Sequence, residues 1–321
     1  MKFSVIIPVF NRPDEINDLI QSIVDQKYKD LEIIVIEDGS SISSNNVINS
    51  FKNKINLQYH EISNQGPGLA RNYGVKLANY EWIIFFDSDC TIPKNYFYEV
   101  NKFLKSNIDI DFFGGPDKSK KNFSFLQKAI NYSMTSILTT GGIRGSQYSV
   151  DKFLPRSFNM GVKKKNFLKI GGFSSMRFGE DLDLTYRLLS SGSKSSVIKD
   201  AYVYHKRRND LIGFFNQIFS SGNARVKLNQ KHKGTFRFFH LLPSLFIIFF
   251  VLICSLLLLN IDFNFILLLQ FIYGIYFILI FLESSFLNQN PFVGFLSVIT
   301  TFVQFFAYGS GYLRAWIKNY L

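Results

Sequence analysis

The sequence predicts an α/β fold, with a mostly parallel sheet flanked by helices, followed by a C-terminal region of apolar helices. Short apolar runs alternate with helix patterns along the N-terminal part of the chain. Such alternation is typical of a parallel sheet that helices cover on both faces. Acidic residues directly follow two of the runs, and after residue 235 the chain becomes almost wholly apolar.

Clear signals bound the first elements. A β-rich apolar run over residues 3–9 predicts a strand. Asn11-Arg12-Pro13 then marks a helix start, with Asn at the cap and Pro in the first turn. Residues 31–36 predict a second buried strand, which ends in Glu37-Asp38.

The later elements follow the same order. A helix is expected over residues 67–79, and the next strand, over residues 81–86, runs directly into Asp87-Ser88-Asp89. Residues 110–155 are less regular and contain two glycine pairs. Regular patterns return at residues 158–162, and they are followed by a helix over residues 180–191 and a strand that ends at His205.

Length and charge indicate two regions. A chain of 321 residues fits one large domain with an appendage, and we expect an α/β domain over residues 1–235 and a membrane region over residues 236–321. The formal net charge is +12, and most of it lies in the first region. The charged residues after residue 235 are Arg237, Asp262, Glu283, Arg314 and Lys318.

A basic stretch precedes the apolar tail. No acidic residue lies between Asp210 and Asp262, whereas several basic residues do. They are Arg225, Lys227, Lys231, Lys233 and Arg237. A basic patch can bind nucleic acid, but its place beside an apolar segment favours anionic membrane lipids, so we expect lipid and no nucleic acid as a partner.

The tail contains two or three candidate transmembrane helices. Residues 241–259 and 263–282 carry no charge, and each stretch is long enough to cross the hydrocarbon core. Residues 291–313 contain Gln304 and the segment Gly309-Ser310-Gly311, so this third stretch either spans the membrane or lies in the interface. The basic stretch places the preceding domain on the cytoplasmic side and the loop over residues 260–262 on the other side.

Two further features agree with a cytoplasmic domain. Residues 1–4 lead straight into the first strand pattern without a secretory signal. The two cysteines, Cys90 and Cys254, are too few for a disulfide framework and lack metal-site spacing. Both observations are compatible with a reducing compartment.

Asp87 and Asp89 form a candidate metal site. Acidic groups at the carboxyl ends of strands lie where an open α/β sheet keeps its ligand. Two carboxylates one residue apart can hold Mg²⁺ or Mn²⁺ against a diphosphate. Turns are also rich in Asp and Ser, so the motif alone is weak evidence for a metal site. Its position directly after a strand strengthens that evidence.

Other polar residues follow the neighbouring strands and helices. Asp38 can accept from a ribose hydroxyl or a base N–H, or it is a turn residue. Arg71 can pair with a phosphate, or it lies on a solvated helix face. Glu180 and Asp181 open a helix, where the dipole favours them, but the same place suits a general base. His205 is a third metal ligand or a structural histidine.

Together these segments resemble the family 2 glycosyltransferases, in order and over roughly residues 3 to 225. The resemblance is carried by residues 4–11, 32–40, 68–72, 87–89, 159–161, 171–173 and 180–184. It implies a GT-A fold and transfer from a nucleotide-activated sugar with inversion at the anomeric carbon. The chain lacks the Gln-x-x-Arg-Trp of processive synthases, which favours one sugar per encounter.

The resemblance also implies roles for individual residues. The nucleotide pocket would be lined by Pro8, Phe10, Asp38 and Arg71. Asp87 and Asp89 would be the metal pair, with Asp89 the direct ligand, and Asp181 would be the base beside Glu180. Asn159 would face the donor sugar or the acceptor.

The sequence therefore predicts an inverting, metal-dependent glycosyltransferase in cell-surface glycan synthesis. It would use a nucleotide-sugar donor and a lipid-linked saccharide acceptor, with its catalytic domain on the cytoplasmic face of the membrane. Two alternatives remain at this point: a polyprenyl-phosphate sugar synthase, whose phosphate acceptor needs no base, and a catalytically inactive membrane scaffold.

Overall fold

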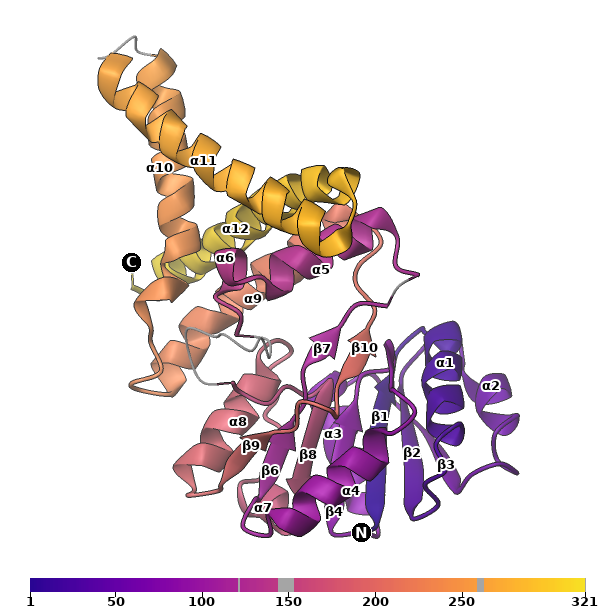
Figure 1. Ribbon diagram of the computed structural model, residues 1–321. Coiled ribbons are helices and arrows are strands. Elements are labelled where there is room, and N and C mark those ends of the chain that lie inside the picture. The colour runs from indigo at the N-terminus through magenta and orange to yellow at the C-terminus, as the bar shows by residue number, and fades with distance from the viewer. Residues whose placement is uncertain (121, 144–152, 259–262, 321) are drawn as a thin grey trace. The chain divides into compact units, whose positions relative to one another are not determined.

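The structure is a computed structural model that describes residues 1–120, 122–143, 153–258 and 263–320 (Figure 1). The chain divides into two compact units. Unit 1 comprises Met1–Lys120 and Ile143–Lys206, and unit 2 comprises Lys121–Gly142 and Arg207–Leu321.

Unit 1 is built on a seven-stranded sheet with the order β3-β2-β1-β4-β8-β6-β9. Its strands are β1 (Phe3–Val9), β2 (Leu31–Asp38), β3 (Leu57–Ile62), β4 (Trp82–Phe86), β6 (Phe112–Gly114), β8 (Asn159–Lys163) and β9 (Ser195–Val197). Neighbouring strands are parallel except where β8 pairs with β4 and with β6. The predicted mostly parallel sheet is therefore confirmed.

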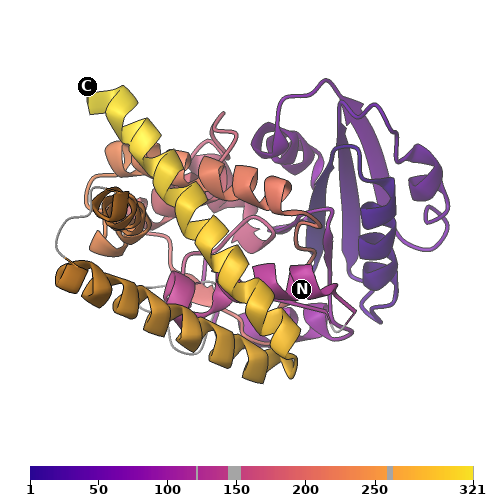
Figure 2. The same cartoon turned by 90° about the horizontal axis from the view of Figure 1, so that it is seen from above.

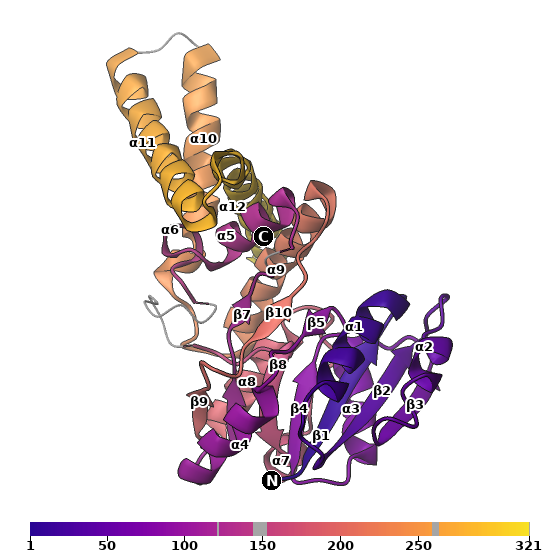
Figure 3. The ribbon, with the colours of Figure 1, turned by 45° about the vertical axis from the view of Figure 1, so that its right-hand side comes forward.

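Helices cover both faces of this sheet, as the unbroken apolar strands predict. The helices are α1 (Pro13–Val24), α2 (Asn45–Asn49), α3 (Pro67–Leu77), α4 (Tyr96–Ser106), α7 (Lys164–Lys169) and α8 (Glu180–Ser190). Figure 3 shows α1 lying across one face of the strands β1 to β3. Alternate side chains of β1 enter two separate cores, with Val5 and Ile7 on the α1 and α4 face and Ile6 on the α3 and α8 face.

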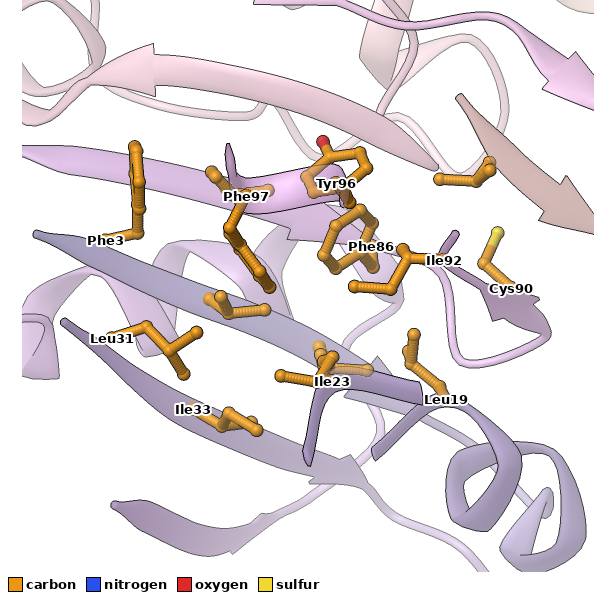
Figure 4. Packing of buried hydrophobic residues seen from close by; sticks show 14 of the residues in the cluster. Phe3, Leu19, Ile23, Leu31, Ile33, Phe86, Cys90, Ile92, Tyr96 and Phe97 are labelled. Carbon is orange, nitrogen blue, oxygen red and sulfur yellow. The ribbon is translucent and has the colours of Figure 1, made fainter. Parts of the chain in front are cut away.

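The first of these cores is rich in aromatic rings. Figure 4 shows Phe3 of β1, Phe86 of β4 and Phe97 of α4 in one cluster with Leu19 and Ile23 of α1. Because burying one such side chain contributes about 1.5–3 kcal/mol, this core is a main source of stability for unit 1. It fixes β1, β2 and β4 in register, and these strands carry the candidate site residues at their ends.

A second, three-stranded sheet adjoins the end of β4. Its order is β5 (Cys90–Thr91), β10 (Val203–His205) and β7 (Asp117–Lys118). β10 is antiparallel to β5, and the register places His205 opposite Cys90. A residue far along the chain is thereby brought beside the Asp-x-Asp turn.

Unit 2 is helical and is organised around one long helix. Its elements are α5 (Phe125–Thr135), α6 (Ile137–Thr140), α9 (Leu211–Lys231), the 3₁₀ turn η1 (Phe238–His240), α10 (Leu242–Leu258), α11 (Phe263–Asn288) and α12 (Pro291–Tyr320). α12 contacts α5, α9, α10 and α11 and runs the length of the unit in Figure 2. α5 and α9 thus pack with the apolar tail, so compact unit 2 includes chain that precedes the boundary expected at residue 235.

Glycines allow α9 and α12 to approach closely. A Cβ added to Gly311 of α12 would lie 2.1 Å from the carbonyl oxygen of Phe219, and one added to Gly222 of α9 would lie 2.1 Å from that of Tyr308. Any larger residue would force these backbones apart. Small residues at apolar helix contacts serve this purpose in membrane proteins.

Polar side chains join α5 to the tail helices. The carboxylate of Glu283 in α11 accepts hydrogen bonds from the hydroxyls of Tyr132 and Ser136, the latter at 2.7 Å. The hydroxyls of Ser133 and Thr300 lie 2.6 Å apart in the buried contact between α5 and α12. These bonds satisfy polar groups that would otherwise be costly among apolar helices.

Two tail helices are long and apolar enough to cross a membrane, by length and composition: Leu267–Asn288 with 22 residues and Pro291–Asn319 with 29 residues. The first predicted span corresponds to α10, an apolar helix of 17 residues. Its last predicted residue, 259, and the loop over residues 260–262 lie outside the described residues. The third predicted span is continuous and extends past residue 313.

Candidate active site

The carboxyl ends of β1, β2 and β4 meet at one edge of the sheet. In the parallel register Val9 lies opposite Glu37, and Ile6 lies opposite both Ile34 and Phe85. Pro8 is buried within β1, whereas the ring of Phe10, just beyond the strand, is 49% exposed. Phe10 therefore offers an apolar surface at the edge where open α/β sheets bind ligands.

Asp38 lies at this edge but points into the protein. Its carboxylate oxygens accept hydrogen bonds from the backbone N–H groups of Gln65 at 2.8 Å and Gly66 at 2.9 Å. Because Gly66 is the cap residue before Pro67, these bonds fix the start of α3. The structure thus gives Asp38 a loop-ordering role, and its predicted contact with a nucleotide stays a prediction.

Arg71 is the central cation of the site. It is 2% exposed, so the alternative of a solvated helix face is wrong. Its guanidinium pairs with Asp87 and lies 3.4 Å from Glu180, and its centre is 5.4 Å from the ring centre of Phe173. One buried side chain from α3 thereby joins the end of β4 to the first residue of α8.

Asp89 forms a second cluster next to this one. His205 Nε2 lies 3.1 Å from Asp89 Oδ1, and Arg12 pairs with the other oxygen. Burial alone would raise the pKa of Asp89, but the nearby His205 and Arg12 hold it well below its usual range. Asp89 therefore stays ionised.

The donor set of this cluster suits a hard divalent cation. Ligand atoms of Asp89, Cys90 and His205 all lie within 4.8 Å of one another. Burial raises the pKa of the Cys90 thiol well above its usual value, so Cys90 is a poor ligand. A carboxylate and an imidazole remain, a pair that can hold Mn²⁺, whereas Mg²⁺ would be held by the carboxylate alone. Asp87 lies outside this cluster, paired with Arg71.

Glu180 and Asp181 begin α8 and differ in their surroundings. Burial raises the pKa of Glu180 to about 7, with the adjacent Asp181 adding to the shift and Arg71 opposing it. Asp181 lies 3.6 Å from Arg156, and its side chain is 16% exposed. Asp181 is therefore the more open of the two carboxylates, as a base that meets an acceptor requires.

Asn159 lies deeper than the sequence suggests. It is fully buried, its Oδ1 accepts from the hydroxyl of Tyr96 at 2.6 Å, and its Nδ2 donates to the carbonyl of Ala201 at 2.8 Å. Both ends of the amide are satisfied inside unit 1. The structure thus gives Asn159 a role in joining α4 and β8 to the chain before β10, in place of the predicted contact with a sugar.

Two site residues were missed by sequence reasoning. Arg12 was read only as part of a helix start, and Arg156 lies in a stretch without regular pattern. Each pairs with a carboxylate that the sequence singled out, Asp89 and Asp181 respectively. A basic residue directly after the first strand, at the edge where the acidic clusters gather, was the available signal for Arg12.

The family of the chain follows from its comparison with known proteins. The model of glycosyl transferase family 2 matches residues 4–179, which is more than half of the chain. The chain belongs to glycosyl transferase family 2. Residues 4–179 therefore form a family 2 glycosyltransferase domain, and the GT-A-type sheet described above is the fold that the resemblance implied.

Relatives of this family 2 member include uncharacterised glycosyltransferases and a polysaccharide synthase. An uncharacterised glycosyltransferase of Rickettsia bellii is 38% identical over 33% of this chain and 15% of its own length. One of Haemophilus influenzae is 29% identical over 59% of this chain and 63% of its own. The poly-β-1,6-N-acetyl-D-glucosamine synthase of Staphylococcus epidermidis is 28% identical over 58% and 45%. In each case the chain matches less than two thirds of the relative.

Solved structures share the fold. The mannosyltransferase PcManGT of Pyrobaculum calidifontis, in complex with GDP-Man and Mn²⁺, superposes with a TM-score of 0.65 at 12% identity, over 94% of this chain and 86% of that one. Residues 1–349 of S. aureus TarS, in complex with UDP-GlcNAc, give a TM-score of 0.51 at 21% identity, over 75% and 69%. At these identities the likeness shows the fold alone.

The raised pKa of Glu180 predicts a pH-dependent stability. Between the ordinary value, 4.5, and about 7, folding takes up a proton at Glu180. The wild type should therefore lose stability as pH rises through this window, and Glu180→Gln should not. The free energy of unfolding of Glu180→Gln, taken relative to that of the wild type, should therefore rise by about 1–3 kcal/mol from pH 5 to pH 8. Thermal unfolding in detergent at the two pH values measures this difference.

The surface residue Glu81 provides the control for this measurement. Glu81→Gln removes a carboxylate without changing a buried site, and its difference from wild type should be the same at both pH values. A Glu180→Gln difference that is also the same at pH 5 and pH 8 would contradict the prediction.

Proposed function

We propose that this chain is an inverting, metal-dependent glycosyltransferase that moves a sugar from a nucleotide-sugar donor to a hydroxyl of a lipid-linked saccharide in cell-surface glycan synthesis. The observation that carries the proposal is the buried contact of Arg71 with both Asp87 and Glu180. It brings the strand-end carboxylates and the helix-start carboxylates to one place. The polysaccharide-building relative and the neighbours with bound UDP-GlcNAc and GDP-Man support the substrate class.

The donor is proposed to lie at the edge formed by β1, β2 and β4. The exposed ring of Phe10 would stack on the base, and the Asp38 loop would border the ribose. Arg71 lies beside Asp87, where its guanidinium would hold a donor phosphate. Bound Mn²⁺ on Asp89 and His205, or Mg²⁺ on Asp89, would supply positive charge for the leaving diphosphate.

The proposed transfer is a single displacement at the anomeric carbon of the donor sugar. The acceptor hydroxyl oxygen forms a bond to the anomeric carbon while the bond from that carbon to the diphosphate oxygen breaks. The acceptor proton passes to the Asp181 carboxylate, and the electron pair of the broken bond leaves with the nucleoside diphosphate. Attack from the face opposite the leaving group inverts the configuration. Arg156 holds Asp181 in place, 3.6 Å away.

Unit 2 is proposed to place the catalytic unit at the cytoplasmic face of the membrane. Lys227, Lys231, Lys233 and Arg237 are exposed, and Phe236 and Phe238 beside them are 46% and 66% exposed. Cations next to exposed aromatic rings suit anionic headgroups above an apolar layer. Arg225, which the sequence placed in this patch, is buried instead.

The proposed function is tested by transfer assays on the full chain in lipid nanodiscs. Labelled UDP-, GDP- and TDP-sugars are offered with Mn²⁺ and a polyprenyl-diphosphate-linked saccharide, and the product linkage is read by NMR. We expect a product of inverted anomeric configuration that forms with one donor class and is lost in EDTA. Asp89→Asn should lower the rate by about 100-fold or more, because it removes the charged oxygen that holds the cation.

The exposed residue Asp109 provides the matched control for Asp89. Asp109→Asn removes the same charge from the surface and should leave the rate unchanged. Transfer that persists in EDTA and in Asp89→Asn would rule out the metal-dependent mechanism, and a product of retained configuration would rule out the single-displacement step.

A polyprenyl-phosphate sugar synthase is the second candidate. Arg156 lies next to Asp181 and could hold a phosphate acceptor, whose oxygen needs no base. The two candidates differ in their requirement for the Asp181 carboxylate, which decides between them.

A further inference from the structure

Arg12 occupies a place that the mechanism above leaves unexplained. Its guanidinium pairs with Asp89 Oδ2, and the carboxylates of Glu15 and Asp87 are near enough to act on its charge. Asp89 is also the carboxylate best placed to bind a divalent cation, with His205 3.1 Å away. The Arg12 guanidinium and a bound divalent cation would therefore interact with the same carboxylate.

The backbone beside Arg12 is fixed by hydrogen bonds, whereas its side chain is partly exposed. Asn11 adopts a left-handed φ of 54°, and its side-chain oxygen accepts from the backbone N–H groups of Ser41 at 2.8 Å and Ile42 at 2.9 Å. These bonds tie the loop after β1 to the loop after β2. The Arg12 side chain itself is 28% exposed and long, so it can exchange one anionic partner for another without moving the backbone.

A guanidinium on Asp89 Oδ2 and a divalent cation on Asp89 Oδ1 would repel one another. Like charges about 4 Å apart repel by several kcal/mol in a partly buried site, so a bound cation would weaken the hold of Asp89 on Arg12 and favour its displacement from Oδ2. The displaced guanidinium would stay near the carboxyl end of β1, at the edge where the donor is proposed to lie. A diphosphate presents pairs of oxygens that the planar guanidinium can bind with two parallel hydrogen bonds.

We infer that Arg12 and a divalent cation compete for Asp89, and that Arg12, once displaced, binds the donor diphosphate. The inference rests on the proposed function, because it takes the Asp89 cluster as the cation site. It adds a consequence that metal coordination alone does not require. Cation and donor binding depend on each other through Arg12, which weakens the binding of the cation without donor and strengthens the binding of the two together.

The first test measures cation binding without any turnover. The full chain in detergent micelles is titrated with MnCl₂, and free Mn²⁺ is read by electron paramagnetic resonance. Arg12→Met should bind Mn²⁺ about tenfold more tightly than the wild type, since the competing charge is gone. Arg12→Lys keeps a charge within reach of Asp89 and should stay close to the wild type.

Lys206→Met is the matched control for the loss of one positive charge. Lys206 follows His205 in the chain, but its ammonium pairs with Glu15 at 3.0 Å and not with Asp89. Its effect on Mn²⁺ affinity should stay within about twofold, which separates competition at Asp89 from a general change in potential. Equal gains in Arg12→Met and Lys206→Met would overturn the inference.

The second test adds a nucleoside diphosphate. With saturating UDP, and separately GDP, the wild type should bind Mn²⁺ more tightly than without nucleotide. For the nucleotide that increases the Mn²⁺ affinity of the wild type, the increase in Arg12→Met should be smaller by at least about tenfold. The same gain in Arg12→Met as in the wild type would show that Arg12 does not move to the diphosphate.

Asp89→Asn separates failure of the inference from failure of the proposed function. Loss of Mn²⁺ binding in Asp89→Asn, together with equal Mn²⁺ affinity in wild type and Arg12→Met, would overturn the inference and leave the cation site standing. Mn²⁺ binding that Asp89→Asn does not affect would overturn both.

Discussion

Replacing Asp181 by asparagine is expected to abolish most sugar transfer to a hydroxyl acceptor. The amide keeps the shape of the side chain but cannot take the acceptor proton, and loss of a general base lowers the rate by about 10²–10⁴-fold. Donor binding should be unchanged, because Asp181 faces Arg156 and not the Arg71 cluster. The measurements are kcat with the lipid-linked acceptor and the Kd for the nucleotide.

Asp14→Asn is the control for this prediction. Asp14 also lies in the first turn of a helix, but it is exposed, so this variant tests whether helix-start acidity alone matters. It should retain the full rate. Near-normal transfer by Asp181→Asn would contradict the role of base and would favour a phosphate acceptor, hence a polyprenyl-phosphate sugar synthase.

Replacing Arg71 by methionine is expected to have the largest effect on stability. Arg71 is the buried partner of Asp87 and Glu180, and removing it leaves their charges without compensation. Breaking a buried ion pair in this way costs about 3–5 kcal/mol. We expect a clear fall in the thermal unfolding temperature of the full chain in detergent, together with loss of nucleotide binding.

A second variant separates charge from packing in this prediction. Arg71→Met combined with Glu180→Gln removes one of the uncompensated carboxylates, so the double variant should regain part of the lost stability. Lys194→Met, which breaks an exposed pair with Asp109, should cost less than about 1 kcal/mol. An Arg71→Met variant as stable as the wild type would show that the buried cluster does not hold the two elements together.

Much of the catalytic fold follows from local patterns. The strands at residues 3–9 and 31–36, and the turn that ends in Asp87-Ser88-Asp89, could be predicted because buried strands need continuous apolar runs. The direction of β8 could not, since a strand pattern reads the same in a parallel or an antiparallel pair. The packing of α5 against α12 could not be predicted either, because the periodicity of a helix does not indicate which other helix it contacts.

In the candidate site, too, some residues could be predicted from the sequence and others could not. The acidic groups could be found because they stand directly after strands or at a helix start. The partner Arg156 could not be found, and Arg12 offered only its position after the first strand, because the contacts of a long side chain leave no periodic signal. Asn159 was assigned to a ligand from the resemblance, but its amide satisfies internal groups, which only the three-dimensional arrangement reveals.

The shared packing of α5 and α9 on α12 determines where this protein can be cut. A soluble fragment that ends near residue 235 would keep both helices but lose their partner, including the carbonyl that faces Gly222. Phe214, Ile218 and Ile130, which now form one core with Ala307, would meet water. Such a truncation exposes an apolar surface that promotes aggregation. Purification of the enzyme therefore depends on keeping the entire chain together with a detergent or lipid.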